Sequence, residues 1–290
     1  MSQSTNQIAP GTLIANGNIR LQELIGEGGF GAVYRAVSVE NGSTGRGETF
    51  AVKVQSRTNI SKVRANVQIR EGALHSLVSG SHPSITSLLQ IHSNPEHLFF
   101  VMPYVVGGNL FAHISSKRYL GQNELIKSVF GQMLDAVTHL HLHGVFHRDL
   151  KPENILCLDE QGSKVVVCDF GLATTSALSQ EFRTGSVHHM SPECAASARP
   201  TESYSPRAND IWSLGIILVN MVTGRAPWST ASPKDPRFIT YLQSPTNFFQ
   251  THLPISPSFI KLLIRVLDPN KNTRASMKEF REAFEEIETF

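Results

Sequence analysis

The segment His147-Arg148-Asp149-Leu150-Lys151-Pro152-Glu153-Asn154 constrains this chain more than any other part of the sequence. It brings acids, bases and an amide together within eight residues. Such a density of charge is costly to bury, so we expect the segment to form a loop that lines a polar cleft. The alternative interpretation is a charged turn on the surface.

A glycine-rich turn near the start of the chain predicts a phosphate-binding site. Residues 19–25 have the pattern of a strand and lead into Gly26-Glu27-Gly28-Gly29-Phe30-Gly31, after which residues 32–37 are again rich in β-forming side chains. A dinucleotide-binding glycine motif would open a helix, whereas this one joins two strands. Glycines have no Cβ, so their backbone N–H groups can approach phosphate oxygens closely.

Lys53 lies within the apolar strand pattern of residues 49–54, where a lysine is costly unless it is paired. Residues 61–79 have helical spacing. The expected apolar positions of this helix are Val63, Val67, Leu74 and Leu77. Glu71 lies within the same helix and is the predicted partner of Lys53. A lysine that simply faces solvent is the alternative.

The rest of the chain predicts two more strands and then a mainly helical region. We expect strands at 87–92 and 98–102 and a hairpin of 155–158 with 164–168. Helices are expected at 124–143, from 210 to about 224, and from 257 to before 269. A last helix begins with a capping box at Ser276. The apolar stripe of the long helix consists of Ile126, Phe130, Met133, Val137 and Leu140. Residues 172–190 and 195–207 show no period and are predicted to be loops.

Taken together, these motifs resemble those of the eukaryotic protein kinases. They are H-R-D-L-x-x-x-N at 147–154, G-x-G-x-x-G-x-V at 26–33, Ala51-Val52-Lys53 and Asp169-Phe170-Gly171. The resemblance runs from about residue 19 to about residue 284. Lys151 and Ser186 resemble the serine/threonine class. The segments 185–194 and 208–220 are similar to fungal kinases that restrain meiosis and tune nutrient responses.

The resemblance implies an α+β, two-lobed protein-kinase fold. A small five-stranded antiparallel β-lobe with one helix would be followed by a larger, mainly α-helical lobe, with ATP and two Mg²⁺ ions bound between them. The domain boundaries that we expect are a polar tail at 1–18, a kinase domain at 19–287, a first lobe to about 105, a hinge at 103–108 and a second lobe at 109–287.

The resemblance also assigns roles to particular residues. The catalytic set would be Asp149, Lys151, Asn154, Lys53 and Glu71, with Asp149 facing the acceptor hydroxyl. Magnesium would be bound by Asn154 and Asp169. ATP would contact Ile25, Gly26, Glu27, Gly28, Gly29, Phe30, Gly31, Ala32, Val33, Ala51, Lys53, Met102, Pro103, Val105 and Leu156.

Three further pairs follow from the same resemblance. Glu193 should form a buried ion pair with Arg274, and Asp210 should anchor the backbone of the catalytic loop. Arg148 would ordinarily bind a phosphothreonine of the activation loop, but that position falls on Phe182 here. Glu181, beside it, can offer Arg148 a permanent carboxylate instead, so we expect activity without phosphorylation of this loop.

Composition excludes several other classes of protein. Hydrophobic residues make up 40% of the chain and charged residues 17%, as in ordinary globular proteins. A net charge of +2 argues against a nucleic-acid binder. No signal peptide is apparent at the start, and no stretch reaches the roughly 18 apolar residues of a membrane span.

The cysteines and histidines predict neither disulfides nor a metal centre. Cys157, Cys168 and Cys194 form no even framework and have no metal-type spacing, which favours an intracellular protein of the cytoplasm or nucleus. The histidines at 139, 141 and 143 follow one another at steps of two residues, and such a step changes the face of the expected helix. We therefore interpret them as surface or core residues rather than a zinc site.

The function that we expect is an active kinase that phosphorylates Ser and Thr residues of proteins and works as a monomeric catalytic domain. Two alternatives are a binding-only scaffold and a small-molecule kinase. A binding-only scaffold could lose any of Lys53, Glu71, Asp149, Asn154 and Asp169, and all five are present. A small-molecule kinase would not need the Ser191-Pro192-Glu193 segment with Arg274, which shapes a peptide platform in the family. Both features favour transfer to proteins.

Overall fold

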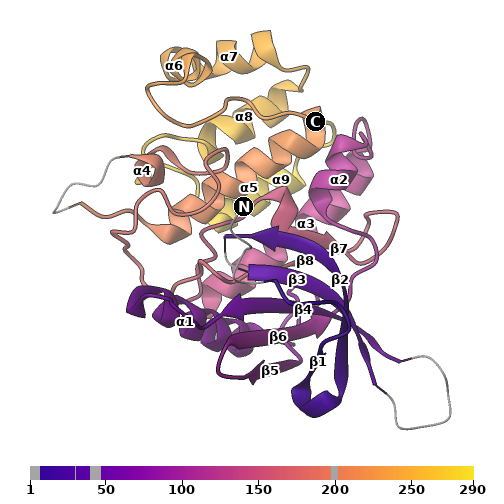
Figure 1. Cartoon of the computed structure of the whole chain (residues 1–290). Helices are drawn as coiled ribbons and strands as arrows, with labels where there is room; N and C mark the ends of the chain where they lie inside the picture. Colours follow the sequence, from indigo (N-terminus) through magenta and orange to yellow (C-terminus); the bar gives the residue numbers. More distant parts are fainter. Residues whose placement is uncertain (1–6, 30, 40–46, 197–201) are drawn as a thin grey trace. The chain divides into compact units, whose positions relative to one another are not determined.

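A computed structural model of the chain describes residues 7–29, 31–39, 47–196 and 202–290. The chain divides into two compact units, Met1–Val105 and Val106–Phe290 (Figure 1). The first unit consists of an antiparallel sheet and one long helix in its described part, and the second is mainly helical. Phe30, predicted to contact ATP, lies outside the described residues.

The sheet of the first unit has the strand order β1-β2-β3-β4-β6-β5, with antiparallel neighbours throughout. Its strands are β1 (Leu13–Ile14), β2 (Ile19–Gly28), β3 (Gly31–Ser38), β4 (Thr49–Ser56), β5 (Gln90–Ser93) and β6 (His97–Pro103), with a short 3-10 helix, η1 (Ala15–Gly17), after β1. Five of the strands correspond to those predicted. The additional strand, β1, places Leu13 and Ile14 beside β2 at the edge of the sheet.

The two faces of this sheet differ in polarity because successive side chains of a strand point to opposite faces. One face carries a buried core that includes Leu21, Tyr34, Val52, Val54 and Val101. Lys53 and Gln55 alternate with the core residues of β4, so they point to the other face. Both are buried there, at 8% and 2% exposure.

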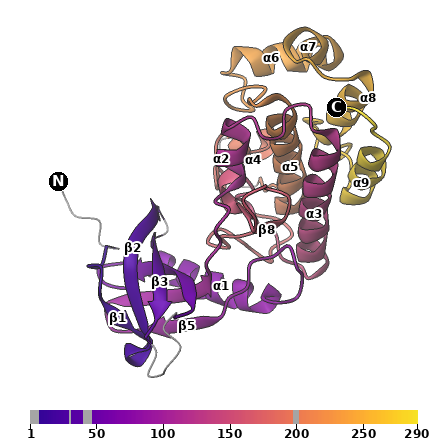
Figure 2. The same cartoon turned by 90° about the vertical axis from the view of Figure 1, so that its right-hand side faces the viewer.

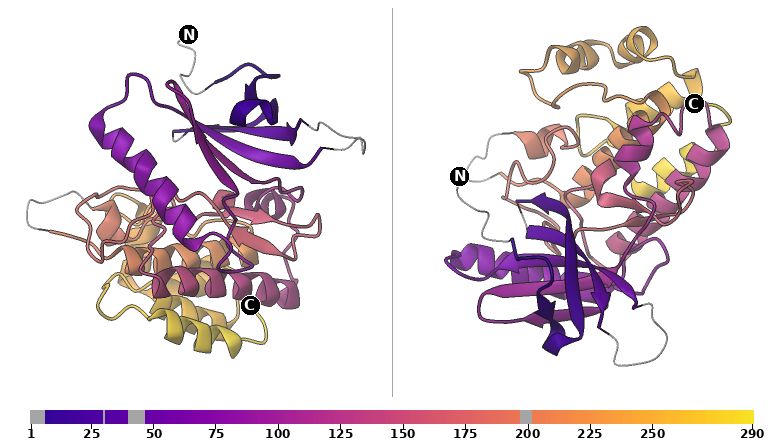
Figure 3. Two further views of the ribbon diagram at one scale, coloured as in Figure 1. Left: turned by 90° about the horizontal axis from the view of Figure 1, so that it is seen from below. Right: turned by 45° about the vertical axis from the view of Figure 1, so that its right-hand side comes forward.

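Helix α1 (Lys62–Val78) lies beside the sheet of the first unit, as Figure 3 shows, and begins at the N-cap Ser61. The prediction of its apolar positions is wrong at Val63 and Leu77, which are 74% and 54% exposed. The prediction is confirmed at Leu74, which is buried together with Gln68, Glu71, Gly72, His75 and Val78. Gln68 donates a hydrogen bond of 2.7 Å to the carbonyl of Ser56 in β4. Hydrogen bonds therefore attach this helix to the sheet, in addition to apolar contacts.

The second unit packs its helices around the long pair α3 and α5, with α8 and α9 beside them (Figure 2). Its elements are α2 (Leu110–Ser115), α3 (Asn123–Leu142), η2 (Pro152–Asn154), β7 (Ile155–Cys157), β8 (Val165–Val167), α4 (Pro192–Ala195), α5 (Pro206–Thr223), α6 (Pro236–Gln243), α7 (Pro245–His252), α8 (Pro257–Val266) and α9 (Met277–Glu285). The predicted apolar stripe of α3 is confirmed, because all five of its residues are buried. The predicted capping box of α9 at Ser276 is also present.

Helix α5 begins four residues before the predicted start at 210. Ser205 is its N-cap and accepts a hydrogen bond from the N–H of Ala208, and Pro206 takes the first helical position. Both residues are common at these positions of a helix. The prediction was wrong because the run of Ser, Pro and Thr before residue 208 was interpreted as loop. Asp210 consequently lies inside the helix, fully buried.

Among the described residues, no helix combines the length and the apolar character needed to cross a bilayer.

Candidate active site

The loop that follows α3 is held by the buried carboxylate of Asp210. One oxygen of Asp210 accepts the backbone N–H of His147 at 2.9 Å, and the other accepts that of Arg148 at 2.8 Å. The imidazole of His141 lies 2.9 Å from the first oxygen. Arg148 adopts a left-handed backbone with φ of 66°, which a non-glycine residue rarely does without such support. The predicted anchoring of the loop by Asp210 is therefore confirmed.

Asp149 is held in this loop with one oxygen occupied and one left open. Lys151 Nζ donates to Oδ2 at 2.8 Å, and Asn154 Nδ2 donates to the same oxygen at 3.1 Å and to the Asp149 carbonyl at 2.8 Å. Asp149 Oδ1 is buried and accepts no hydrogen bond from any described residue. A buried carboxylate oxygen without a donor is costly, and such a group is common where a substrate supplies the partner.

Asp169 lies close to Asn154 because the β7–β8 hairpin joins the ends of their segments. Ile155 pairs with Val167, and the N–H of Cys168 donates to the carbonyl of Asn154 at 3.0 Å. The backbone of Asp169 is left-handed, with φ of 65°. Carboxylate and amide oxygens are ligands that magnesium prefers, so the chemistry of these two side chains suits the predicted metal site.

In the first unit, Lys53 and Glu71 form the predicted ion pair, at 2.6 Å between Nζ and Oε1. Glu71 is only 3% exposed. Its other oxygen, Oε2, accepts a hydrogen bond of 2.7 Å from Gln55 Nε2. Gln55 was not predicted as a site residue, although its position two residues after Lys53 on a strand places both side chains on one face.

The glycine-rich turn joins β2 to β3, as predicted, and Gly28 pairs with Gly31 where the strands meet. A Cβ at Gly28 or Gly29 would meet no atom within 4 Å, so these two glycines leave open space. At Gly31 the backbone has φ of 143° and a Cβ would lie 2.4 Å from the carbonyl oxygen of Val54. Gly31 is thus required by packing, whereas Gly28 and Gly29 leave room for a ligand to approach the backbone.

The other predicted nucleotide contacts lie on strands β2, β3, β4 and β6, in the segment after β6, and on β7 of the second unit. Strand pairing places Val33 beside Lys53 and Ala51 beside Met102. Ala32, which alternates with Val33, is fully buried in the core on the opposite face. Its side chain is therefore not placed with that of Val33, and only its backbone is available to a ligand on the Val33 face.

Arg148 and Glu181 contact each other as predicted, with Nη1 donating to Oε2 at 2.6 Å. Arg148 also donates to Ser179 Oγ at 3.3 Å and through Nε to the carbonyl of Leu172 at 2.5 Å. Ser179 and Tyr204 exchange two backbone hydrogen bonds of 2.9 Å. These contacts fix the segment 172–190, which contains no helix or longer strand, as predicted.

The predicted pair of Glu193 and Arg274 is present in bidentate form, with distances of 2.7 and 2.9 Å. Arg274 also lies over the ring of Trp212, at 4.9 Å from the guanidinium carbon to the ring centroid. Because Arg274 is buried, the pair fixes the α4 segment to the loop before α9.

His189 is a buried residue near this site that the sequence analysis did not single out. It lines a pocket of about 250 Å³ together with Glu153 and Ser186. Its Nε2 lies 3.2 Å from the side-chain oxygen of Asn220, and its Nδ1 lies 3.3 Å from Ser186 Oγ. Burial lowers the pKa of His189 from 6.5 to about 4, an effect that the nearby His188 and Lys151 add to and Asn220 opposes.

This pKa predicts a loss of stability in mild acid. Between pH 6.5 and pH 4 the unfolded chain binds a proton at His189 that the folded chain does not, so stability is full above this range and falls through it. The loss at His189 amounts to as much as about 3 kcal/mol. We expect His189→Gln to flatten the pH dependence of the free energy of unfolding, measured by urea titration. His143→Gln, at an exposed imidazole, is the control. Parallel pH curves for wild type and His189→Gln would contradict the assignment.

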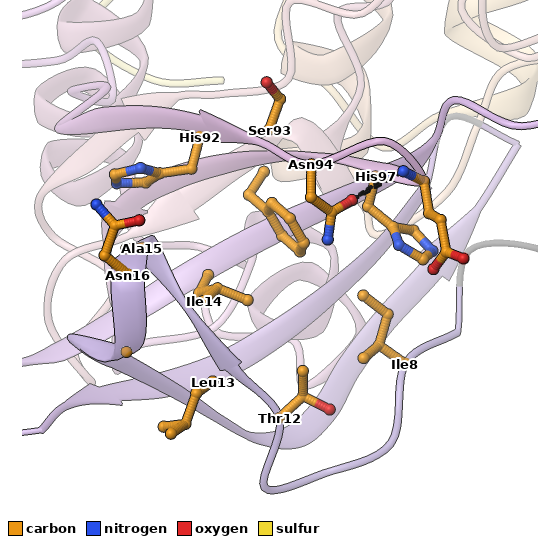
Figure 4. Close-up of a pocket in the computed structure, with 13 residues that line it drawn as sticks. Ile8, Thr12, Leu13, Ile14, Ala15, Asn16, His92, Ser93, Asn94 and His97 are labelled. Carbon is orange, nitrogen blue, oxygen red and sulfur yellow. Dashed lines mark hydrogen bonds between the residues drawn. The ribbon is translucent and has the colours of Figure 1, made fainter.

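A larger pocket, of about 340 Å³, lies in the first unit away from the predicted site residues (Figure 4). Its wall includes Ile14, Asn16 and the turn between β5 and β6. Within this turn the side-chain oxygen of Asn94 accepts the backbone N–H of His97 at 2.6 Å. Figure 4 shows where Asn94 and His97 lie in the wall of the pocket. None of the predicted catalytic or ATP-binding residues lines this pocket.

Comparison with known proteins matches this arrangement to one family. The protein kinase domain family matches residues 19–284. The negative regulator of sexual conjugation and meiosis of Schizosaccharomyces pombe is 36% identical over 282 residues, which cover 90% of this chain and 58% of the relative. The serine/threonine-protein kinase ksp1 of the same yeast is 36% identical over 71% of this chain and 45% of its own length.

A plant relative, the CBL-interacting serine/threonine-protein kinase 14 of Arabidopsis thaliana, is 33% identical over 91% of this chain and 57% of its own length. The chain thus spans about half the length of the curated relatives that it matches. These matches confirm the predicted α+β fold and the resemblance to serine/threonine kinases, including a fungal regulator of meiosis.

Proposed function

Because the chain belongs to the protein kinase domain family, we propose that it transfers the γ-phosphoryl group of ATP to Ser and Thr hydroxyls of proteins in signalling. The observation that carries this proposal is the open oxygen of Asp149. Transfer to a hydroxyl needs an acceptor for its proton, and Oδ1 is a buried carboxylate oxygen with no described donor.

The neighbours of Asp149 have complementary tasks. Asn154 and Lys151 hold Oδ2, so they orient Oδ1 toward an incoming hydroxyl. The side chain of Lys151 is one quarter exposed, which supports a contact of its ammonium group with the transferred phosphoryl group as well. A preorganised positive charge stabilises the charge that develops on the phosphoryl oxygens without a cost of reorientation.

Members of this family use ATP and a divalent metal. We propose that Asn154 and Asp169 hold two Mg²⁺ ions. The side-chain nitrogen of Asn154 donates both of its hydrogen bonds to Asp149, which leaves the side-chain oxygen of Asn154 for a ligand. Bound magnesium would neutralise negative charge on the phosphates. Two side-chain ligands are few, so phosphate and water oxygens would complete the coordination.

In the first unit, Lys53 is proposed to bind the α- and β-phosphates while Glu71 orients it. Gly28 and Gly29 are proposed to present their backbone N–H groups to the phosphates, where no Cβ obstructs approach. Arg64 donates a hydrogen bond of 2.7 Å to the carbonyl of Gly29, which holds the backbone at that glycine.

We further propose that the chain acts as a monomeric catalytic domain inside the cell, in the cytoplasm or nucleus, on protein substrates. All three cysteines are free thiols, which suits a reducing compartment. The bidentate pair of Glu193 and Arg274 supports a protein rather than a small-molecule acceptor, because it stabilises the segment next to the loop of Asp149.

The proposal is tested by incubating the purified chain with ATP, Mg²⁺ and a library of peptides that contain Ser or Thr. We expect phosphate transfer to the peptides. ATP binding without any transfer would identify a scaffold instead. Transfer to small alcohols but to no peptide would identify a small-molecule kinase.

Activity should not require phosphate on the segment 172–190. Glu181 already gives Arg148 a carboxylate at 2.6 Å, and Phe182 packs its ring 5.7 Å from that of Tyr204. We expect phosphatase-treated protein, verified by mass spectrometry to carry no phosphate in this segment, to keep its activity. Glu181→Ala should lower that activity roughly three- to tenfold, because a buried guanidinium loses a charge-assisted hydrogen bond.

The matched control is Glu160→Ala, at an exposed position of the β7–β8 turn. It should leave the activity unchanged. Activity that disappears after phosphatase treatment and returns only with phosphate on residues 172–190 would overturn the prediction. Equal activities of Glu181→Ala and Glu160→Ala would show that the carboxylate of Glu181 does not support activity.

A further inference from the structure

Gln55 is placed to act on the ion pair of Lys53 and Glu71. It follows Lys53 by two residues on β4, so both side chains lie on one face of the sheet. Gln55 Nε2 donates to Glu71 Oε2 at 2.7 Å, while Lys53 Nζ donates to Oε1 at 2.6 Å. A single strand thus holds both oxygens of one buried carboxylate.

The orientation of the Gln55 amide follows from the chemistry of its partner. An ionised carboxylate only accepts hydrogen bonds, so the NH₂ group must face Glu71. The amide oxygen, Oε1, is then buried and accepts no hydrogen bond from any described residue. A buried acceptor without a donor costs stability, whereas an apolar side chain of the same length would not. The unsatisfied Oε1 therefore offsets part of the stability that the hydrogen bond from Gln55 to Glu71 contributes.

Polar contacts help to attach the helix that carries Glu71, alongside its buried Leu74 and Val78. Ile69 and Val63 of α1 are 69% and 74% exposed, so they contribute little apolar packing. Gln68 attaches the helix to β4 by donating to the carbonyl of Ser56, one residue after Gln55. The stem of Gln55 also lies against the glycine turn, because a Cβ at Gly31 would be 3.2 Å from Gln55 Cγ.

We propose that Gln55 is a positioning residue that orients the Glu71 carboxylate toward Lys53 and so sets the geometry in which Lys53 meets the nucleotide phosphates. The inference rests on the proposed kinase function. Gln55 itself acts only through Glu71 and is not assigned a contact with the substrate.

The first test compares two buried glutamines of the same interface. Gln55→Met keeps the length of the side chain and removes the donor together with the orphan acceptor. We expect kcat to fall about tenfold, the weaker end of what a hydrogen bond to a charged group supports, with the peptide KM unchanged. Tm should also fall, because Glu71 Oε2 loses a donor, so kcat and not Tm distinguishes this variant from its control. Gln68→Met, the matched control, should lower Tm and leave kcat near the wild-type value, because it frees the Ser56 carbonyl and not Glu71.

A second variant gives a signature that a packing role would not produce. Gln55→Glu places a second carboxylate against Glu71, and one proton shared by the pair restores a donor. We expect the ratio of the kcat of Gln55→Glu to that of wild type to rise as the pH is lowered from about 8 to about 6. The same ratio for Gln55→Met should stay flat over this range.

The double variant Gln55→Met with Glu71→Gln completes the test. If Gln55 acts through Glu71, the double variant should be no slower than Glu71→Gln alone. A further tenfold loss, or parallel losses of Tm and kcat in Gln55→Met and Gln68→Met, would overturn the proposal.

Failure of the kinase function itself would be recognised separately, because the wild type would then transfer no phosphate. In that event, amide hydrogen exchange of residues 66–76 still decides the positioning role. If residues 66–76 exchange faster in Gln55→Met than in wild type, and the rest of the chain exchanges at the wild-type rate, the positioning role of Gln55 is supported. Unchanged exchange over these residues would contradict it.

Discussion

Asp149→Asn is expected to abolish phosphoryl transfer while ATP still binds. Asparagine has nearly the size of aspartate and can accept the hydrogen bonds that Lys151 and Asn154 donate to Oδ2. Its amide is not a base, however, so the acceptor hydroxyl loses the group that takes its proton. We expect turnover to fall by about 10²- to 10⁴-fold, the range for a general base.

Peptide phosphorylation measures the loss, and titration with a fluorescent ATP analogue measures binding. Asp135→Asn makes the same chemical change on the surface of α3, where the carboxylate pairs with Arg281, and it should leave both quantities unchanged. Near-normal turnover of Asp149→Asn would show that Asp149 is not the proton acceptor. Loss of ATP binding in the same variant would show that it has a structural role in the nucleotide site.

Lys53→Met should lower turnover by at least about 10²-fold. Methionine keeps the stem of the lysine but removes the charge that Glu71 orients at 2.6 Å, and a preorganised charge at the phosphates is worth about this much. Lys278→Met is the control, because that lysine is 84% exposed at its side chain. Steady-state kinetics with ATP and a peptide substrate check the prediction.

Glu71→Gln should also be slow, because Lys53 would then lack its charged partner. If Lys53→Met and Glu71→Gln both leave turnover close to wild type, this pair does not order the site. Lys53→Met should also lose stability, because Glu71 is then buried without its cation. The comparison of turnover still holds, because kcat is measured on the folded fraction of each variant.

The sequence predicted the elements of the site where chemistry dictates residue type and spacing. Asp149, Asn154 and Asp169 were found because their motifs carry fixed roles, and Lys53 was recognised because a lysine in an apolar strand needs a partner. The pairing with Glu71 could be predicted for the same reason, whereas the anchor at Asp210 followed from the resemblance to the family. The functional roles of these residues stay predictions until they are measured.

Other features could not be predicted because they depend on packing rather than on a motif. The face of α1 that lies on the sheet is largely polar, so a search for apolar periodicity selected Val63 and Leu77, which are exposed. Gln55 resembled an ordinary strand residue until its contact with Glu71 was seen. The start of α5 was hidden by the Ser and Pro residues before residue 208, which also serve as caps.

Helices α6 and α7 gave no signal strong enough to be predicted in the sequence. Their buried aromatic residues, among them Phe238, Tyr241 and Phe248, pack around Trp228, a residue outside both helices. The residues of this cluster come from separate segments of the chain. Each of the two helices is therefore too short, and has too few apolar residues, to show a helical period in the sequence.

The central claim, transfer of a phosphoryl group from ATP to Ser or Thr, is tested most directly with four peptides that differ only at the acceptor, which is Ser, Thr, Tyr or Ala. The peptides are incubated with ATP, Mg²⁺ and either the wild-type chain or Asp149→Asn, and the products are identified by mass spectrometry. The account predicts phosphate on the Ser and Thr peptides with wild type, and almost none with Asp149→Asn. Phosphate on the Tyr peptide alone, or equal product from both proteins, would contradict it.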